Sequence, residues 1–191
     1  MPAVPFTPRL AAEYAALFDS CVTIPSRAPE VAFASGRVTR HRGRYETLGR
    51  ELGIPWVFIG ILHTMESSGR FDRHLHNGDP LTARTTRVPA GRPLQGQPPF
   101  TWDESAADAL AMKKLGQGTD WSLPGMLYQF ERYNGFGYRQ QHGIHSPYLW
   151  SLSTHYTSGK YVEDGTWSDT AVSKQCGAAV LLKELMTRGE A

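Results

Sequence analysis

Glu66 is the residue of this chain best placed to act as a general acid. It follows an almost wholly apolar segment, residues 55–65, and precedes a short polar segment that contains Gly69. This pattern predicts a helix buried nearly all round, with the Glu66 carboxyl group in low dielectric at the negative end of the helix dipole. Both conditions disfavour the ionised form, as a general acid for neutral pH requires. The more ordinary interpretation is that Glu66 is the first exposed residue after a core helix.

Polar and titratable side chains crowd the turn that follows, which indicates a cleft. The segment reads Phe71-Asp72-Arg73-His74-Leu75-His76-Asn77-Gly78-Asp79-Pro80-Leu81-Thr82. The string His74, His76 and Asp79 could bind a divalent metal, because alternate residues of an extended strand point the same way. A metal would need a further ligand, which His63 would have to supply. We therefore expect no metal and no cofactor.

Size and composition are those of one ordinary globular domain. The chain has 191 residues, of which 40% are hydrophobic and 20% charged. Its net charge of +2 does not suggest a nucleic-acid partner. We expect a monomer made in the cytoplasm without a signal peptide and without stable membrane insertion, because no apolar stretch approaches the roughly 20 residues of a membrane span. Cys21 and Cys176 are expected to be buried thiols, with a bridge between them as the alternative.

Caps, prolines and apolar spacing predict a mainly helical chain. The expected helices cover about residues 8–22, 44–52, 55–66, 101–115, 122–133 and 168–188. Between residues 69 and 99 glycines and prolines forbid a long helix, while the threonine-rich segment 81–88 suits one arm of a hairpin. The sequence therefore predicts helices around a buried helix, with one small β-hairpin that lines the cleft beside Glu66.

Three pieces of the chain, in this order, resemble the lysozyme-like superfamily, which holds phage and goose-type lysozymes and the lytic transglycosylases. The first leads from Leu52-Gly53-Ile54-Pro55-Trp56 through the apolar helix to Glu66-Ser67. The second is the polar segment 76–86, in the place of that superfamily's active-site hairpin. The third is Glu131-Arg132-Tyr133-Asn134-Gly135, which is similar to the Tyr-Asn-Ala-Gly element that faces the catalytic acid across the cleft. The likeness covers about residues 44–185. The stretch from Trp56 to Trp150 also resembles small phage-associated or prophage-encoded proteins of the family.

The resemblance implies an α+β lysozyme-like fold, with residues 1–191 as one catalytic domain on which the helix and loop of residues 1–43 pack. It implies an endolysin-like muramidase that cleaves the MurNAc-GlcNAc strands of bacterial peptidoglycan after release to the cell wall. Glu66 would donate the proton to the scissile oxygen, and Asp79 would be the second acid, as in goose-type and phage lysozymes. Asp72 is the rival second acid, with an ordinary alternative as a partner of Arg70 or Arg73.

Two alternatives remain open. The chain lacks the Gly-Leu-Met-Gln run that follows the Glu-Ser pair of lytic transglycosylases, and it has Asp79, so a hydrolase is favoured over a transglycosylase that leaves 1,6-anhydro-MurNAc ends. The other alternative is a non-catalytic glycan-binding module on the same fold. Such a module has no reason to keep an acid in apolar surroundings, and Glu66 therefore favours an enzyme.

Further residues are expected to contact the glycan. Tyr133 and Asn134 would face the cleft, with Gly135 as their helix cap. His76 and Asn77 would hydrogen-bond the substrate or hold Asp79, and Thr82 is a hairpin residue that could position a water. Sugar rings stack on aromatic faces, which makes an aromatic loop a candidate rim of the cleft. The aromatic residues of that loop are Tyr138, Tyr148, Trp150 and Tyr156.

Overall fold

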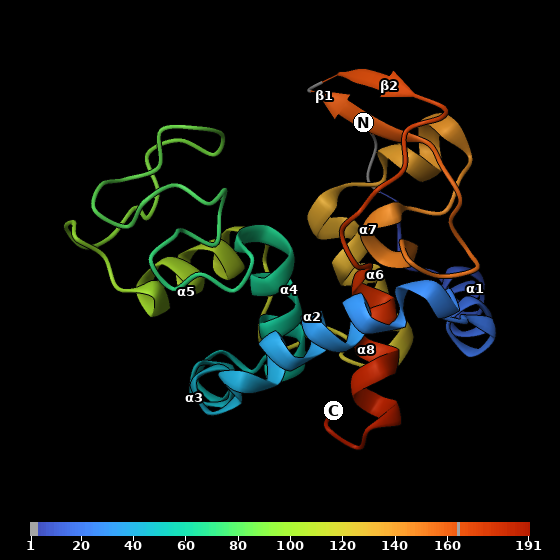
Figure 1. Ribbon diagram of the computed structural model, residues 1–191. Helices are drawn as coiled ribbons and strands as arrows, with labels where there is room; N and C mark the ends of the chain where they lie inside the picture. Colours follow the sequence, from blue (N-terminus) through green and yellow to red (C-terminus); the bar gives the residue numbers. More distant parts are fainter. Residues whose placement is uncertain (1–3, 164) are drawn as a thin grey trace. The chain divides into compact units, whose positions relative to one another are not determined.

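The structure is a computed structural model that describes residues 4–163 and 165–191. In this part of the chain it is mainly helical, with a small two-stranded antiparallel hairpin, so the expected mainly helical α+β class is confirmed (Figure 1). The chain forms two compact units. Unit 1 combines the N-terminal segment up to Ser35 with Asp120–Ala191, and unit 2 is Gly36–Thr119. That the whole chain acts as a single catalytic domain stays a prediction.

Unit 1 is a set of helices around α6 (Leu123–Asn134). Helices α1 (Pro8–Ser20), α7 (Pro147–Trp150) and α8 (Ala178–Thr187) each pack on α6, and α7 also packs on α8. Single turns of 3-10 helix at Pro25–Arg27 and of π-helix at Tyr138–His142 (η2) lie between them. The core of this unit is formed by fully buried side chains, among them Tyr14, Leu127, Phe130, Leu149 and Leu181.

Unit 2 contains α3 (Arg42–Leu52), α4 (Trp56–Ser67) and α5 (Trp102–Met112), and α3 packs on both of the others. Helix α2 (Ala28–Arg40) contains the boundary between the units. The sequence predicts a loop here, on the basis of Pro25 and Pro29, and this prediction is wrong for Ala28–Arg40. Pro29 lies in the first turn of α2, where a proline costs no hydrogen bond.

Capping side chains place three helix starts where the sequence predicts them. Thr7 Oγ1 accepts a hydrogen bond from the third residue along, at the start of α1, and Ser122 does the same for α6. Thr101 and Glu104 form the predicted reciprocal capping box at the start of α5. Each cap satisfies amide groups that have no partner inside their own helix, so local sequence fixes these boundaries.

The hairpin belongs to unit 1, whereas Glu66 belongs to unit 2. Strands β1 (Lys160–Glu163) and β2 (Thr166–Ser168) pair antiparallel, with Tyr161 opposite Trp167 (Figure 1). Within the described residues no strand lies at 81–88, so the predicted cleft hairpin is wrong in its location. There the amide groups that a strand would offer to a partner are bound locally instead. Asp79 accepts from the amide groups of Thr86 and Arg87, and the Thr85 hydroxyl donates to the Pro89 carbonyl.

The last helix is shorter than predicted, because residues 168–177 are not helical. The amide group of Gly159 donates to the carbonyl of Ala171, and the amide group of Gly177 donates to that of Ser151. A Cβ atom at Gly177 would lie 2.2 Å from the Leu149 carbonyl oxygen. This close approach holds the segment against α7, and α8 therefore begins only at Ala178.

We predict that Gly60→Ala destabilises the protein. A Cβ atom at Gly60 would lie 2.8 Å from Cγ1 of Val38 and 3.0 Å from the ring of Tyr45, in a tightly packed contact. The free energy of unfolding should fall by about 1–3 kcal/mol, measured by denaturant titration. Gly43→Ala is the matched control, because nothing lies within 4 Å of its Cβ position in α3. That variant should gain about 0.5–1 kcal/mol, and equal effects of the two substitutions would contradict the close packing.

Candidate functional site

Helix α4 carries Glu66 on its last turn, as predicted. Most of its residues from Val57 to Met65 are buried, and Glu66, next to the last residue of the helix, is half-buried. The helix ends with Ser68 in the left-handed conformation at φ 56°. Glu66 is the acid of this helix, and it lies on the last turn, at the negative end of the helix dipole. Its position therefore suits a proton donor.

His63, one turn before Glu66, ties the helix to the chain that follows it. Its Nδ1 atom lies 2.8 Å from the Tyr45 hydroxyl and its Nε2 atom 3.1 Å from the Arg70 carbonyl oxygen. Burial lowers the pKa of His63 to about 4, so the ring is neutral near pH 7. The hydroxyl then donates to Nδ1, and Nε2–H donates to the carbonyl. The rings of Phe71 and Trp102 lie 4.6 and 4.4 Å from that of His63 and complete a buried cluster.

Asp79 is buried, at 5% exposure, and organises the loop that follows α4. Its Oδ2 atom accepts from the amide groups of Thr86 at 2.8 Å and Arg87 at 3.1 Å, and its Oδ1 atom accepts from Arg87 Nε at 2.6 Å. Burial alone would raise the pKa of Asp79, but these hydrogen bonds and the Arg87 charge hold that pKa well below its ordinary value. Asp79 is therefore a firmly ionised carboxylate. Its role as second catalytic acid stays a prediction.

Asn77 holds Asp79, which is one of the two roles that the sequence suggests. Its Oδ1 atom accepts from the Asp79 amide group at 3.0 Å, and its Nδ2 atom donates to the Arg87 carbonyl at 2.9 Å. Thr82 is exposed beside this loop. Asp72, the rival second acid, is 63% exposed and paired with Arg70 at 2.7 Å, which fits its ordinary interpretation.

His76 anchors the same loop to α5 instead of presenting its ring to a ligand. Its side chain has no exposed surface, and its Nε2 atom lies 2.8 Å from Asp108 Oδ2. Burial lowers the pKa of His76, while Asp108 partly offsets this effect. The Ser105 hydroxyl lies 3.5 Å from His76 Nδ1 and 2.8 Å from His74 Nδ1. Ser105, His76 and Asp108 have the residue types of a catalytic triad, but Ser105 is fully buried and no substrate can reach it.

Asp108 of α5 binds the loop between α4 and α5, and the sequence analysis did not identify it. Besides His76 it accepts from the Arg92 guanidinium and from the Leu94 amide group, both at 3.3 Å. A signal was present, because Asp108 is an acid among the buried residues Ala106, Ala109 and Leu110 of α5. Within the described residues no three His, Cys, Asp or Glu side chains gather as metal ligands. Both ring nitrogens of His74 have other partners, Ser105 and the Ala83 carbonyl.

In unit 1, the C-terminal end of α6 opens into a groove of about 610 Å³. Asn134 is exposed and lines it, while Tyr133, its predicted companion, is buried. Gly135 follows with φ 101°, a conformation that favours glycine. The residues that line the groove are Asn134, Gly135, Gly137, Tyr138, Gln141, Tyr161 and Gly165. Sequence reasoning found Asn134 and Tyr138 but missed Gln141 and Tyr161.

A buried ion pair fixes the η2 turn at the edge of this groove. Glu131 of α6 is 1% exposed, accepts from the Tyr14 hydroxyl at 2.5 Å and lies 3.2 Å from Arg139. Arg139 also pairs with Glu13 of α1 at 2.6 Å. Burial and the charge of Glu131 raise the pKa of the Tyr14 hydroxyl above its ordinary value, so this group remains a hydrogen-bond donor. The network joins α1, α6 and η2, which carries Tyr138.

The expectation that sugars stack on Tyr148 and Trp150 is wrong, because both side chains are buried. Both belong to α7, and Trp150 is 1% exposed with its ring 5.4 Å from that of His155. Tyr156 is also buried, and its hydroxyl donates to the Gly159 carbonyl. These rings pack in the core of unit 1, because α7 is enclosed by α6 and α8. Of the four aromatic residues expected at a rim, Tyr138 lines the groove at the end of α6, and Tyr156 borders a smaller pocket of about 250 Å³.

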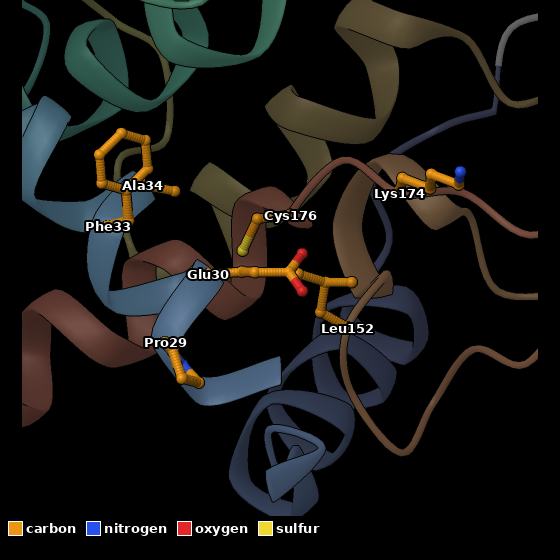
Figure 2. Close-up of a pocket in the computed structure, with 7 residues that line it drawn as sticks. All are labelled: Pro29, Glu30, Phe33, Ala34, Leu152, Lys174 and Cys176. Carbon is orange, nitrogen blue, oxygen red and sulfur yellow. The ribbon is translucent and has the colours of Figure 1, made fainter. Parts of the chain in front are cut away.

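A second cavity of unit 1, of about 370 Å³, holds none of the predicted site residues. Figure 2 shows Glu30, Leu152 and Cys176 close together in it, with Lys174 at a distance from them. Cys176 and Cys21 are free and buried. Burial raises the pKa of Cys176 to about 12, so the thiol stays protonated and is a poor nucleophile.

Comparisons of this chain with protein-family models, with curated proteins and with solved structures found no match. Across residues 4–163 and 165–191, no helix is both long enough and apolar enough to span a membrane.

We predict that Asp79→Asn loosens the loop and destabilises the fold. Asparagine keeps the size of the side chain but loses the charge that Arg87 and two amide groups bind, so the free energy of unfolding should fall by about 2–4 kcal/mol. The folded-state pKa of Asp79 is lowered, so the stabilisation is present above the ordinary carboxyl range, near pH 4, and is lost as the pH falls toward the folded value. Thermal and denaturant unfolding between pH 2 and pH 7 measure both effects.

Asp72→Asn is the control for this experiment, because its exposed ion pair contributes about 0–1 kcal/mol. Equal stabilities of the two variants would contradict the organising role of Asp79. Activity measured on the same samples separates structure from chemistry. A stable but inactive Asp79→Asn variant would point to catalysis.

Proposed function

We propose that this protein is a peptidoglycan glycosidase of the lysozyme type, with Glu66 as the general acid. The observation that carries the proposal is the position of Glu66, half-buried at the end of the apolar helix α4 and followed by a loop that side chains hold firmly. The proposal also uses the resemblance of the segments around Glu66 and Asn134 to the lysozyme-like superfamily, and it includes that fold. The protein acts on the cell wall after release, as an endolysin or prophage lysis protein does.

The proposed chemistry needs one proton donor and one stabilising group. Glu66 gives its proton to the glycosidic oxygen as the bond from that oxygen to the anomeric carbon breaks. Positive charge develops on the sugar ring, and water attacks the anomeric carbon. In the hydrolase, Asp79 takes the proton of this water and then releases it to solvent, and Glu66 is reprotonated from solvent.

A specific observation favours a second candidate, a lytic transglycosylase. The carboxylate of Asp79 accepts hydrogen bonds on both oxygens from Thr86 and Arg87. A carboxylate held in this way is a weak base for water. In a transglycosylase the 6-hydroxyl of the sugar attacks its own anomeric carbon and returns a proton to Glu66. One acid then performs both steps and leaves a 1,6-anhydro end.

We predict that Glu66→Gln keeps the fold and abolishes the release of fragments from purified sacculi. The amide has nearly the same shape but cannot donate the proton, so the rate should fall by about 10² to 10⁴ or more. A turbidity assay and a melting curve measure the two properties. Glu51→Gln, an exposed position on α3, is the control and should retain activity. Near wild-type clearing by Glu66→Gln with an unchanged melting curve would refute the proposed role, and an inactive wild-type protein that still binds sacculi would indicate a binding module.

We predict that the released muropeptides carry reducing ends, because Asp79 is present to handle the water. Mass spectrometry of the fragments distinguishes them from 1,6-anhydro ends, which are lighter by one water. Anhydro ends would replace the hydrolase with the transglycosylase and leave Glu66 as both acid and base. Reducing ends combined with an active, stable Asp79→Asn variant would remove Asp79 from the mechanism while keeping the hydrolase.

A further inference from the structure

We propose that His145 and His155 of unit 1 form a binding site for a divalent transition-metal ion. Both side chains line a pocket of about 250 Å³, where the turn 143–145 after η2 meets the segment 155–158 that precedes β1. Their imidazole rings lie edge to face, with the ring centroids 5.9 Å apart. The fold thus brings together two side chains of the type that most often binds metals in proteins. The chemistry assigned to Glu66 and Asp79 makes no use of this pocket.

Hydrogen bonds to backbone carbonyl groups determine which nitrogen of each ring carries the proton. The Nδ1 atom of His145 lies 3.3 Å from the carbonyl oxygen of His155, and the Nε2 atom of His155 lies 2.8 Å from that of Leu17. A carbonyl oxygen can only accept, so each of these nitrogens donates, and the Ser20 hydroxyl oxygen at 3.2 Å shares the second N–H. In neutral imidazole the lone pairs then remain on Nε2 of His145 and Nδ1 of His155. Among the described residues neither of these two atoms has a hydrogen-bond partner.

Two lone pairs on imidazole nitrogens select a transition-metal cation over other small ions. An anion requires hydrogen-bond donors or positive charge, but the ring N–H groups are already bound to carbonyl groups, and no lysine or arginine is among the described residues of the lining. Mg²⁺ and Ca²⁺ prefer oxygen ligands, above all carboxylates, and these lining residues include no acid either. Neutral imidazole suits Zn²⁺, Ni²⁺ and Cu²⁺. The lining therefore fits a metal of that group.

The arrangement of the two rings matches that of a two-histidine metal site. With metal–nitrogen bonds of about 2.0–2.1 Å, two imidazoles on one ion have ring centroids roughly 5–6 Å apart, as here. A metal-binding histidine usually donates its other N–H to a carbonyl group, which fixes the ring and makes the ligating nitrogen more basic. Both rings are held in this way without a metal. Within the described residues no group of three His, Cys, Asp or Glu side chains could hold an ion, so water completes the coordination, and we expect weaker binding than at a four-ligand structural zinc site.

The test is calorimetric titration of the full-length, untagged chain with zinc chloride and nickel chloride, after dialysis against a chelator. The expected result is saturable binding of one ion per chain for both metals and no binding of Mg²⁺. Loss of even a supporting partner of a metal ligand costs about 10–100-fold in affinity, so loss of a ligand in His145→Ala should weaken Zn²⁺ binding by at least about tenfold. His145 is exposed, and a melting curve checks that the variant folds. His41→Ala is the matched control, because His41 is also exposed and does not line the pocket.

Paramagnetic broadening by Ni²⁺ locates the bound ion. The amide NMR signals of residues 143–145 and 155–158 should broaden first in the wild-type chain and stay sharp in His145→Ala. Three outcomes would overturn the proposal: no binding of either metal at millimolar concentration, equal affinities of the wild-type chain and His145→Ala, or broadening centred on another histidine. Binding of Mg²⁺ as tight as that of Zn²⁺ would overturn the assignment to imidazole ligands. None of these measurements uses a glycan, so the result does not depend on the proposed glycosidase activity.

Discussion

The packing of α3 against α4 is the contact on which the surroundings of Glu66 depend. The ring of Tyr45 lies against Gly60, where a side chain would not fit, and its hydroxyl binds His63 on the same helix. The other ring nitrogen of His63 binds the Arg70 carbonyl, four residues beyond Glu66. One contact therefore sets both the helix that carries the acid and the first turn of the chain after it. A charged imidazole would disrupt this arrangement, and burial keeps His63 neutral.

The loop between α4 and α5 shows how side chains can replace a sheet. Asp79 and Asp108 accept hydrogen bonds from amide groups at 86, 87 and 94, and Thr85 binds the carbonyl of Pro89. In a sheet, the carbonyl groups of a neighbouring strand would accept from these amide groups. A single carboxylate can accept from several of them, and the chain can then turn sharply. The loop is therefore irregular in shape and still densely bonded. The segment that follows the helix of Glu66 therefore has a fixed form without regular secondary structure.

Local signals allowed much of the helical fold to be predicted, and side-chain contacts beyond a single helical turn account for the failures. The caps at Thr7, Thr101 and Ser122 act within one turn of their own helices, so sequence alone locates them. The hairpin was missed at 160–168, although an Asp-Gly pair between strand-forming residues is a hairpin signal. It was expected at 81–88, where the side chain of Asp79, a few residues earlier in the chain, binds the amide groups of Thr86 and Arg87. Likewise Trp150 is a residue type on which sugar rings stack, and only the packing of α7 reveals that it is buried.

The main difference between the hydrolase and the transglycosylase mechanisms lies in the role of Arg87. The same acids are present in both. The Oδ1 atom of Asp79 is held by the Arg87 guanidinium, whose side chain is 66% exposed, while Oδ2 is held by backbone amide groups. The guanidinium is the exposed member of this pair, so a bound ligand can reach it and displace it from the buried carboxylate. The amide groups would stay in place and keep Asp79 ionised. Oδ1 would then be open to a water molecule, as the hydrolase requires. A transglycosylase would leave the pair intact, because its nucleophile belongs to the sugar.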